Sequence, residues 1–232
     1  MAEKMYTQGE YLDKNPDWHV EDSPWKAEQI LKIIEKNNLR PSSICEVGCG
    51  GGEILNCLYR KMPSNVSFVG YEISPQAFEL CQRRKIDRLQ FYLKNLFDDA
   101  EAYFDIVMAI DVVEHVEDYF NFLRNLRIRG RYKIFHIPLD LSVQTVLRSS
   151  PLLRGRRLVG HIHYFTKETA LAALVDTGYE VLDFFYTAGS VELPSKSLYS
   201  SLAKWPRKIL YHLNEDVSVR ILGGYSLMVL AK

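Results

Sequence analysis

The sequence predicts one α/β domain with a doubly wound, mostly parallel sheet of seven strands and an antiparallel edge strand. Short apolar runs alternate with helical segments over the first two thirds of the chain, and this alternation is typical of parallel strands covered by helices on both faces. The length of 232 residues suits a single domain that carries insertions. The last two apolar runs are joined by a long connection, which favours an antiparallel pair at one edge.

Caps and helix breakers delimit the elements in order. Ser23-Pro24 and Ser74-Pro75 are typical of helix starts, Thr166 is a helix cap, and Gly178 ends that helix. The predicted strands are 43–47, 66–71, 89–93, 104–110, 132–139, 179–185 and 225–231. The predicted helices lie between them, at about 23–36, 53–62, 75–85, 118–126 and 166–178.

Composition narrows the function classes. Lys+Arg and Asp+Glu both number 29, so no net charge favours nucleic acid or a membrane surface. No apolar run approaches the roughly 20 residues of a membrane span, and the amino terminus has no apolar signal region. We therefore expect a cytoplasmic protein. The four cysteines contain no CxxC pair and no Cys/His cluster with zinc spacing, so we expect free thiols and no metal.

The strongest local signal is the loop Glu46-Val-Gly-Cys-Gly-Gly-Gly52, which follows the first predicted strand. Four glycines exceed what a tight turn needs, and the first strand-to-helix turn of such a sheet is a usual ligand site. In the dinucleotide fingerprint G-x-G-x-x-G, the third glycine position is occupied here by Glu53. A carboxylate in the first helical turn disfavours a pyrophosphate, so a nicotinamide dehydrogenase is a third choice.

The loop resembles the first motif of the class I S-adenosylmethionine-dependent methyltransferases, E/D-x-G-x-G-x-G, at Glu46, Gly48, Gly50 and Gly52. Glu72 ends the second predicted strand, 20 residues after Gly52, where that family places an acid. The stretches FDIVMAIDVVEHVED (104–118) and GHIHYFTKETALAALVDTGYEV (160–181) resemble later segments of small-molecule enzymes of the ubiquinone-biosynthesis type.

This resemblance implies S-adenosyl-L-methionine as the cofactor and assigns residues to it. The backbone from Gly48 through Cys49 and Gly50 to Gly52 would contact the methionine part, and Glu46 would face its ammonium group. Glu72 would hold the ribose, with Ile73 beside the adenine. The other implied contacts are Asn95 and Leu96 near the adenine edge, where relatives often have Asp first, and Asp111 and Val112 beside the sulfonium.

The expected reaction is methyl transfer to a small-molecule acceptor, at an oxygen, because of the type of enzyme that the chain resembles. A hydroxyl acceptor needs a base, and histidine has a pKa of about 6.5. His115, after the fourth strand, is one candidate, and one of His161 and His163 is another, because alternate residues of an extended stretch face opposite sides. N-methylation, protein or RNA methylation, and cofactor binding without catalysis remain alternatives.

Three segments outside the motifs each allow more than one interpretation. Residues 1–40 would form a helical extension, in which Trp18, His19, Trp25 and Lys26 either close a lid over the cofactor or staple the first helix to the domain at 41–232. That domain carries insertions at about 140–160 and 189–220. In the first insertion, Arg148, Arg154, Arg156 and Arg157 form a solvated face or a site for an anionic acceptor. In the second, residues 195–213 cover the sheet or form a homodimer contact, with a membrane surface less favoured.

Overall fold

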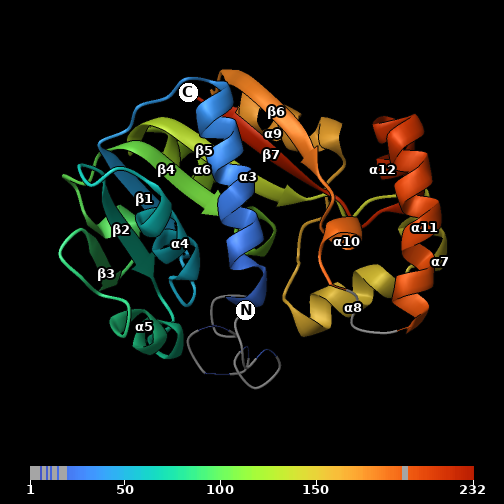
Figure 1. Cartoon of the computed structure of the whole chain (residues 1–232), viewed down its shortest axis with the longest axis horizontal. Helices are drawn as coiled ribbons and strands as arrows, with labels where there is room; N and C mark the ends of the chain where they lie inside the picture. The colour runs from blue at the N-terminus through green and yellow to red at the C-terminus, as the bar shows by residue number, and fades with distance from the viewer. Residues whose placement is uncertain (1–5, 7–8, 10, 12–14, 16–19, 195–197) are drawn as a thin grey trace.

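The core of the fold is a seven-stranded sheet in the order β3-β2-β1-β4-β5-β7-β6 (Figure 1). The computed structural model describes residues 6, 9, 11, 15, 20–194 and 198–232, with the backbone alone for 198–203. The strands from β3 to β5 are parallel, and β7 is antiparallel to β5 and β6. Their bounds are β1 Ser43–Val47, β2 Ser67–Glu72, β3 Leu89–Leu93, β4 Phe104–Ile110, β5 Gly130–Pro138, β6 Val181–Thr187 and β7 Ser226–Ala231.

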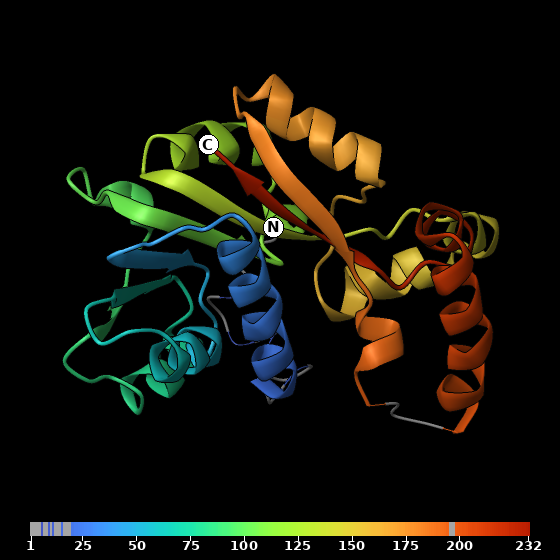
Figure 2. The same ribbon diagram turned by 45° about the horizontal axis from the view of Figure 1, so that its top comes forward.

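The predicted fold class is confirmed, with one refinement at the antiparallel edge. The antiparallel strand β7 lies one place inside the edge, between β5 and β6. The connection from β6 to β7 consists of helices at the end of the sheet where β6 finishes (Figure 2). Because the chain re-enters the sheet from that end, β7 has to run against both neighbours.

Helices cover both faces of the sheet, and each face has its own apolar core. One core contains Ile106 and Met108 of β4, and the other contains Val107 and Ala109, as expected for side chains that alternate along a strand. The first face is covered by α3 (Ser23–Lys36), α4 (Glu53–Lys61) and α5 (Pro75–Gln82), and the second by α6 (Tyr119–Arg127) and α9 (Lys167–Asp176).

Local capping agrees with the sequence in most places. The side chains of Ser74 and Thr166 accept hydrogen bonds from backbone N–H groups at the starts of α5 and α9. Pro24 lies in the first turn of α3, but the N-cap is Asp22, which makes no side-chain cap. Helix α5 ends at Gln82, before the predicted end.

Both predicted insertions are helical, and they gather at one end of the sheet, beyond the end of β5 (Figures 1 and 2). The first contains α7 (Val143–Arg148) and α8 (Ser150–Leu158), on which all four arginines are exposed. The second contains α10 (Gly189–Glu192), α11 (Leu198–Leu213) and α12 (Glu215–Leu222). Among the described residues, no helix combines the length and the apolar character needed to cross a membrane.

Candidate functional site

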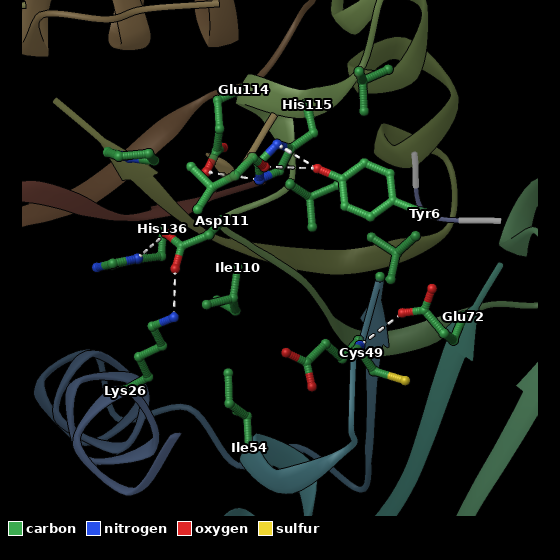
Figure 3. Close-up of a pocket in the computed structure, with 18 of the residues that line it drawn as sticks. Tyr6, Lys26, Cys49, Ile54, Glu72, Ile110, Asp111, Glu114, His115 and His136 are labelled. Atoms are coloured by element: carbon green, nitrogen blue, oxygen red, sulfur yellow. Dashed lines mark hydrogen bonds and ion pairs between the residues drawn. The ribbon is translucent and has the colours of Figure 1, made fainter. Parts of the chain in front are cut away.

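A cavity of about 810 Å³ opens where β1, β2 and β4 end. Such a volume lies in the upper part of the range of about 300–1,000 Å³ typical of small-molecule sites. We name two parts of its wall, which Figure 3 shows in close-up. The loop side consists of residues 46–51, 72–73 and 95–96, and the histidine side consists of Tyr6, Lys26, residues 111–112 and 114–115, His136 and His161.

The glycines of the loop side have separate tasks. Gly48, Gly50 and Gly52 have φ values of 66°, 54° and 74°, which side chains other than glycine rarely adopt. A Cβ atom on Gly48 would lie 3.0 Å from Val112, at the wall of the cavity. Gly52 does not line the cavity, and a Cβ there would lie 2.6 Å from the ring of Phe91. Gly52 therefore lets α4 pack on the sheet, a role different from the predicted cofactor contact.

Two buried carboxylates flank this loop. Glu46 is 1% exposed, and its Oε2 has no hydrogen-bond partner among the described residues. Burial raises the pKa of Glu46 well above its ordinary value, and the charges of Glu72 and Asp111 act in the same direction, against Lys26. A cationic or donor group of a ligand placed beside Oε2 would give this buried oxygen a partner.

Glu72 is already held by the backbone. Its Oε2 accepts the N–H of Gly50 at 2.8 Å, and its Oε1 accepts the N–H groups of Ile73 and Ser74, each at 2.8 Å. Burial nevertheless leaves the pKa of Glu72 raised. Three of about four acceptor positions are used, so in this conformation the carboxylate has room for one ligand hydroxyl on Oε2.

The other residues predicted on the loop side line the cavity as a group. Asn95 caps the short helix η2 (Leu96–Asp98) by accepting the N–H of Phe97 at 3.0 Å, so its amide group still has donors for a ligand. Leu96 is fully buried, and Ile73 is 36% exposed at the cavity wall. The thiol of Cys49 is buried 4.0 Å from that of Cys81, so only its backbone is available. Each of these positions suits an apolar or hydrogen-bonding edge of a ligand.

Asp111 is the centre of a charged group at the end of β4. Its φ is 54°, and its carboxylate contacts His136 Nδ1 at 2.5 Å and Lys26 Nζ at 2.7 Å (Figure 3). His136 also contacts Thr187 Oγ1 at 2.8 Å. Burial would raise the pKa of Asp111, but His136 and Lys26 outweigh it and hold that pKa far below its ordinary value. The carboxylate of Asp111 is therefore ionised, and its two partners hold it in place at the wall of the cavity.

The turn after β4 is the short helix η3 (Val113–His115), which places Glu114 and His115 in the cavity. The backbone N–H groups of Ile162 and His163 both donate to the carbonyl of Glu114, at 2.9 and 3.1 Å. This pairing brings His161 to the same wall, and its ring centroid lies 5.0 Å from that of His115. Burial, followed by the nearby His161, lowers the pKa of His115 to about 4.

The two alternating histidines face opposite ways, as the sequence predicts for an extended stretch. His161 lines the cavity. His163 does not, and its Nε2 donates to the backbone carbonyls of Val116 at 2.9 Å and Glu117 at 3.2 Å. Of the three histidines proposed for catalysis, the structure therefore brings together His115 and His161 and places His163 in the support of the turn.

Sequence reasoning missed several residues of the histidine side. Glu114 is fully buried in the cavity wall, and Tyr6 bonds His115 Nδ1 at 2.8 Å. Lys26 was predicted to belong to a lid or staple in the extension at 1–40, and its pairing with Asp111 was not predicted. The "EH" pair at 114–115 was the available signal for Glu114, because it lies in the stretch 104–118 that resembles a segment of the methyltransferases. Nothing local pointed to Tyr6, which lies 109 residues from His115.

The amino-terminal segment contributes to the cavity in part. Trp25 lines it, with Nε1 donating to Glu192 at 2.6 Å and its ring 6.2 Å from that of His136. Trp18 and His19 lie outside the described residues. None of Arg148, Arg154, Arg156 and Arg157 is among the residues that line the cavity. Helix α3 thus forms a wall of the site as well as packing on the sheet.

Comparison with known families identifies the chain. A family model described as a methyltransferase domain matches residues 22–183, which is well over half of the sequence. The chain belongs to this methyltransferase family. The family and the fold together confirm the identification, made from the glycine loop and Glu72, of a class I S-adenosylmethionine-dependent methyltransferase. A search of curated protein sequences finds no match for this methyltransferase.

Solved structures share the fold of this methyltransferase at low sequence identity. The plantazolicin methyltransferase in complex with SAH has 13% identity and a TM-score of 0.64, covering 99% of this chain and 92% of that one. The magnesium protoporphyrin IX methyltransferase from Synechocystis PCC 6803, with bound SAH, has 16% identity and a TM-score of 0.59, covering 90% and 82%. The [4+2]-cyclase SpnF has 14% identity and a TM-score of 0.58, covering 89% and 80%. Proteins of this fold therefore differ in their substrates and even in reaction type.

Proposed function

We propose that this methyltransferase methylates a hydroxyl oxygen of a small molecule, with S-adenosylmethionine bound along the loop side. The observation that supports the cofactor's placement is the buried Oε2 of Glu46, which has no partner in the described structure and lies at the glycine loop. A cationic amino group would satisfy it. Glu53, which also lines the cavity, is paired with Arg84 at 2.5 Å, so the preference against phosphate depends on Glu46 and Glu72 instead.

Different residues of the loop side would contact different parts of the cofactor. Glu46 would take the ammonium group, and the Gly48–Gly50 backbone would lie along the methionine part. Glu72 would take a ribose hydroxyl on Oε2, with Ile73, Asn95 and Leu96 around the adenine. Asp111 and Val112 would border the sulfonium.

When bound, the cofactor supplies a methyl group that a lone pair of the acceptor attacks in line while the C–S pair returns to sulfur. The chain's own contribution is to position the acceptor and exclude water, which can lower a barrier by about 7–11 kcal/mol. The acceptor would lie on the histidine side, next to Asp111. Because His115 has a depressed pKa, its ring is neutral at pH 7, so an unprotonated nitrogen is available where a hydroxyl has to lose its proton.

The proposal is tested with isotopically labelled methyl donor, purified protein and a metabolite extract. We expect one small compound to gain an alkali-stable methyl ether that is absent with heat-treated protein. Label on nitrogen, on protein or on RNA would support the other methylation classes. Cofactor binding without any labelled product would indicate a binding protein, and tighter binding of NAD(H) than of S-adenosylmethionine would overturn the cofactor assignment.

Four further expectations stay proposals. The extension at 1–40 would act as a lid through Lys26 and Trp25, which line the cavity. A homodimer would use the exposed side chains of Trp205, Ile209 and Leu213 on α11, and a size measurement in solution tests it. An anionic acceptor would have to reach the arginines of α7 and α8 from the cavity, and a cytoplasmic location remains a prediction.

A further inference from the structure

The histidine side contains three acceptor atoms that face one another. Glu114 Oε1 lies 3.7 Å from His115 Nε2 and 3.9 Å from His161 Nε2. One ligand atom from each of these three side chains lies within 4.8 Å of the other two. Glu114 is fully buried, and neither of its carboxylate oxygens has a hydrogen-bond partner in the part of the chain that the structure describes. Figure 3 shows Glu114 and His115 side by side at the cavity wall.

The hydrogen bonds on the far side of each ring determine where its proton lies. His161 Nδ1 contacts Asp140 Oδ2 at 2.6 Å, and an ionised carboxylate only accepts, so Nδ1 carries the proton. His115 Nδ1 lies 3.1 Å from the carbonyl of Gly160, which also only accepts. The hydroxyl of Tyr6, which contacts the same Nδ1, donates to the carbonyl of Val159 at 3.1 Å. Both rings therefore turn a lone pair on Nε2 toward Glu114.

Two imine lone pairs and a carboxylate repel one another when nothing lies between them. A proton on Glu114 would bond to only one of the three partners, and burial makes an unpaired polar group costly. A divalent cation would satisfy all three. Bound at about 2.0–2.2 Å to each atom, it would bring the ligand atoms to roughly 3–3.5 Å apart, so the two Glu114–histidine distances of 3.7 and 3.9 Å would each shorten by about 0.2–0.9 Å.

We propose that Glu114, His115 and His161 form a binding site for a divalent first-row transition metal such as Zn²⁺, Fe²⁺ or Ni²⁺. Two imidazole nitrogens favour these metals over Mg²⁺ and Ca²⁺, which prefer oxygen ligands. The contacts of Nδ1 with Asp140 and with Gly160 are the outer partners that metal-binding histidines usually have, because they fix the ring and its tautomer. His115 and His161 lie 46 positions apart, so sequence spacing does not reveal the site.

Three protein ligands leave at least one coordination position open. All three residues line the same cavity as the glycine loop, so that position is available to an oxygen of the acceptor. A hydroxyl bound there would lose its proton to solvent and remain as a bound oxygen anion, the form that attacks a methyl group. This role depends on the proposed function. In it, His115 and His161 act as metal ligands rather than as free bases.

The test measures metal binding directly, without turnover. The full-length protein is stripped with a chelator and titrated with Co²⁺, whose visible absorption reports nitrogen ligation, and with Zn²⁺ by calorimetry. We expect one equivalent to bind with micromolar or tighter affinity. Glu114→Gln and His161→Gln, which remove one ligand each, should abolish the Co²⁺ absorption. Asp140→Asn should weaken binding by about 10- to 100-fold, as loss of an outer partner does.

The matched control is His212→Gln, because His212 is an exposed histidine on α11 and its loss should leave the titration unchanged. Glu114→Gln and His161→Gln are both tested in case one of them misfolds. The melting temperature of each is compared with that of the wild type in metal-free buffer. Absence of Co²⁺ and Zn²⁺ binding at millimolar concentration would overturn the site, as would binding that survives in both ligand variants. Methyl transfer to the metabolite extract is measured with the same samples, so failure of the metal site is distinguishable from failure of the proposed methyl transfer.

Discussion

The loop side and the histidine side of the cavity are built in different ways. The loop side is mostly backbone from one turn, and its main acid, Glu72, is held by N–H groups of residues 50, 73 and 74. The histidine side consists of side chains from five distant segments that hold one another, such as Lys26 with Asp111 and Tyr6 with His115. A site made of local backbone is encoded by a motif, whereas a site made of distant side chains depends on the whole fold.

The largest expected effect comes from adding a methyl group at Gly52. Gly52→Ala combines a left-handed φ of 74° with a Cβ 2.6 Å from Phe91. Strain and overpacking each cost about 1–3 kcal/mol, so we expect the free energy of unfolding to fall by about 2–6 kcal/mol. The control is Gly155→Ala in α8, where a Cβ would meet nothing closer than 4.0 Å. Urea denaturation measures both, and an equal response of the two variants would contradict the packing role of Gly52.

The next largest effect concerns the affinity of the loop side for S-adenosylmethionine. Glu72→Gln places an amide where three N–H groups and a ribose hydroxyl need acceptors. Because hydrogen bonds to a charged group are worth about 1.5–3 kcal/mol, we expect S-adenosylmethionine to bind about 10- to 100-fold more weakly. Glu79→Gln, on the exposed face of α5, is the control. Calorimetric titration measures the two affinities, and unchanged binding in Glu72→Gln would remove this carboxylate from the cofactor site.

The third test compares two lysines of one helix. Lys26 is 16% exposed and pairs with Asp111 at 2.7 Å, whereas Lys36 is 54% exposed and pairs with Asp183 at 2.8 Å. Breaking a buried pair costs about 3–5 kcal/mol, but Asp111 keeps His136, so we expect Lys26→Met to cost about 1–3 kcal/mol. Lys36→Met should cost less than about 1 kcal/mol, as exposed pairs do. Equal unfolding free energies for the two variants would show that the histidine side does not depend on α3.

The smallest effect lies at the opposite end of the sheet. Asp105 accepts hydrogen bonds from Ser42, at its backbone N–H (2.7 Å) and its hydroxyl (2.6 Å), which lower the pKa of Asp105. A lowered pKa means that the stabilisation is present above the unfolded pKa of about 3.9 and is lost as the pH falls through the folded value. Asp105→Asn should therefore cost about 1 kcal/mol at pH 7, and the difference should shrink in acid.

Cofactor affinity is the second measurement on Asp105→Asn. Because Ser42 and Asp105 lie at the amino ends of β1 and β4, away from the cavity, we expect the affinity for S-adenosylmethionine to equal that of the wild type. A weakened affinity would show that the loop side is coupled to the far end of the sheet.

The strands and the loop side were predicted well because their signals are local. Apolar runs bounded by Pro, Gly and Asn placed every strand within two residues of its observed limits. The position of β7 inside the edge was not predictable. It depends on where the helices of the second insertion, between β6 and β7, return the chain to the sheet. Asp140, the partner of His161, also went unnoticed, since an isolated Asp in a loop has no pattern of its own.

The sequence by itself determined the α/β fold, the methyltransferase family and the carboxylates around the glycine loop, because each depends on residues close together in the chain. Only the tertiary structure decided which histidines face the cavity, and that they meet Glu114. A backbone pairing of residues 162 and 163 with Glu114 makes that choice. Contacts between distant segments arise from the packing of the whole sheet and its helices, and no short stretch of sequence contains that information.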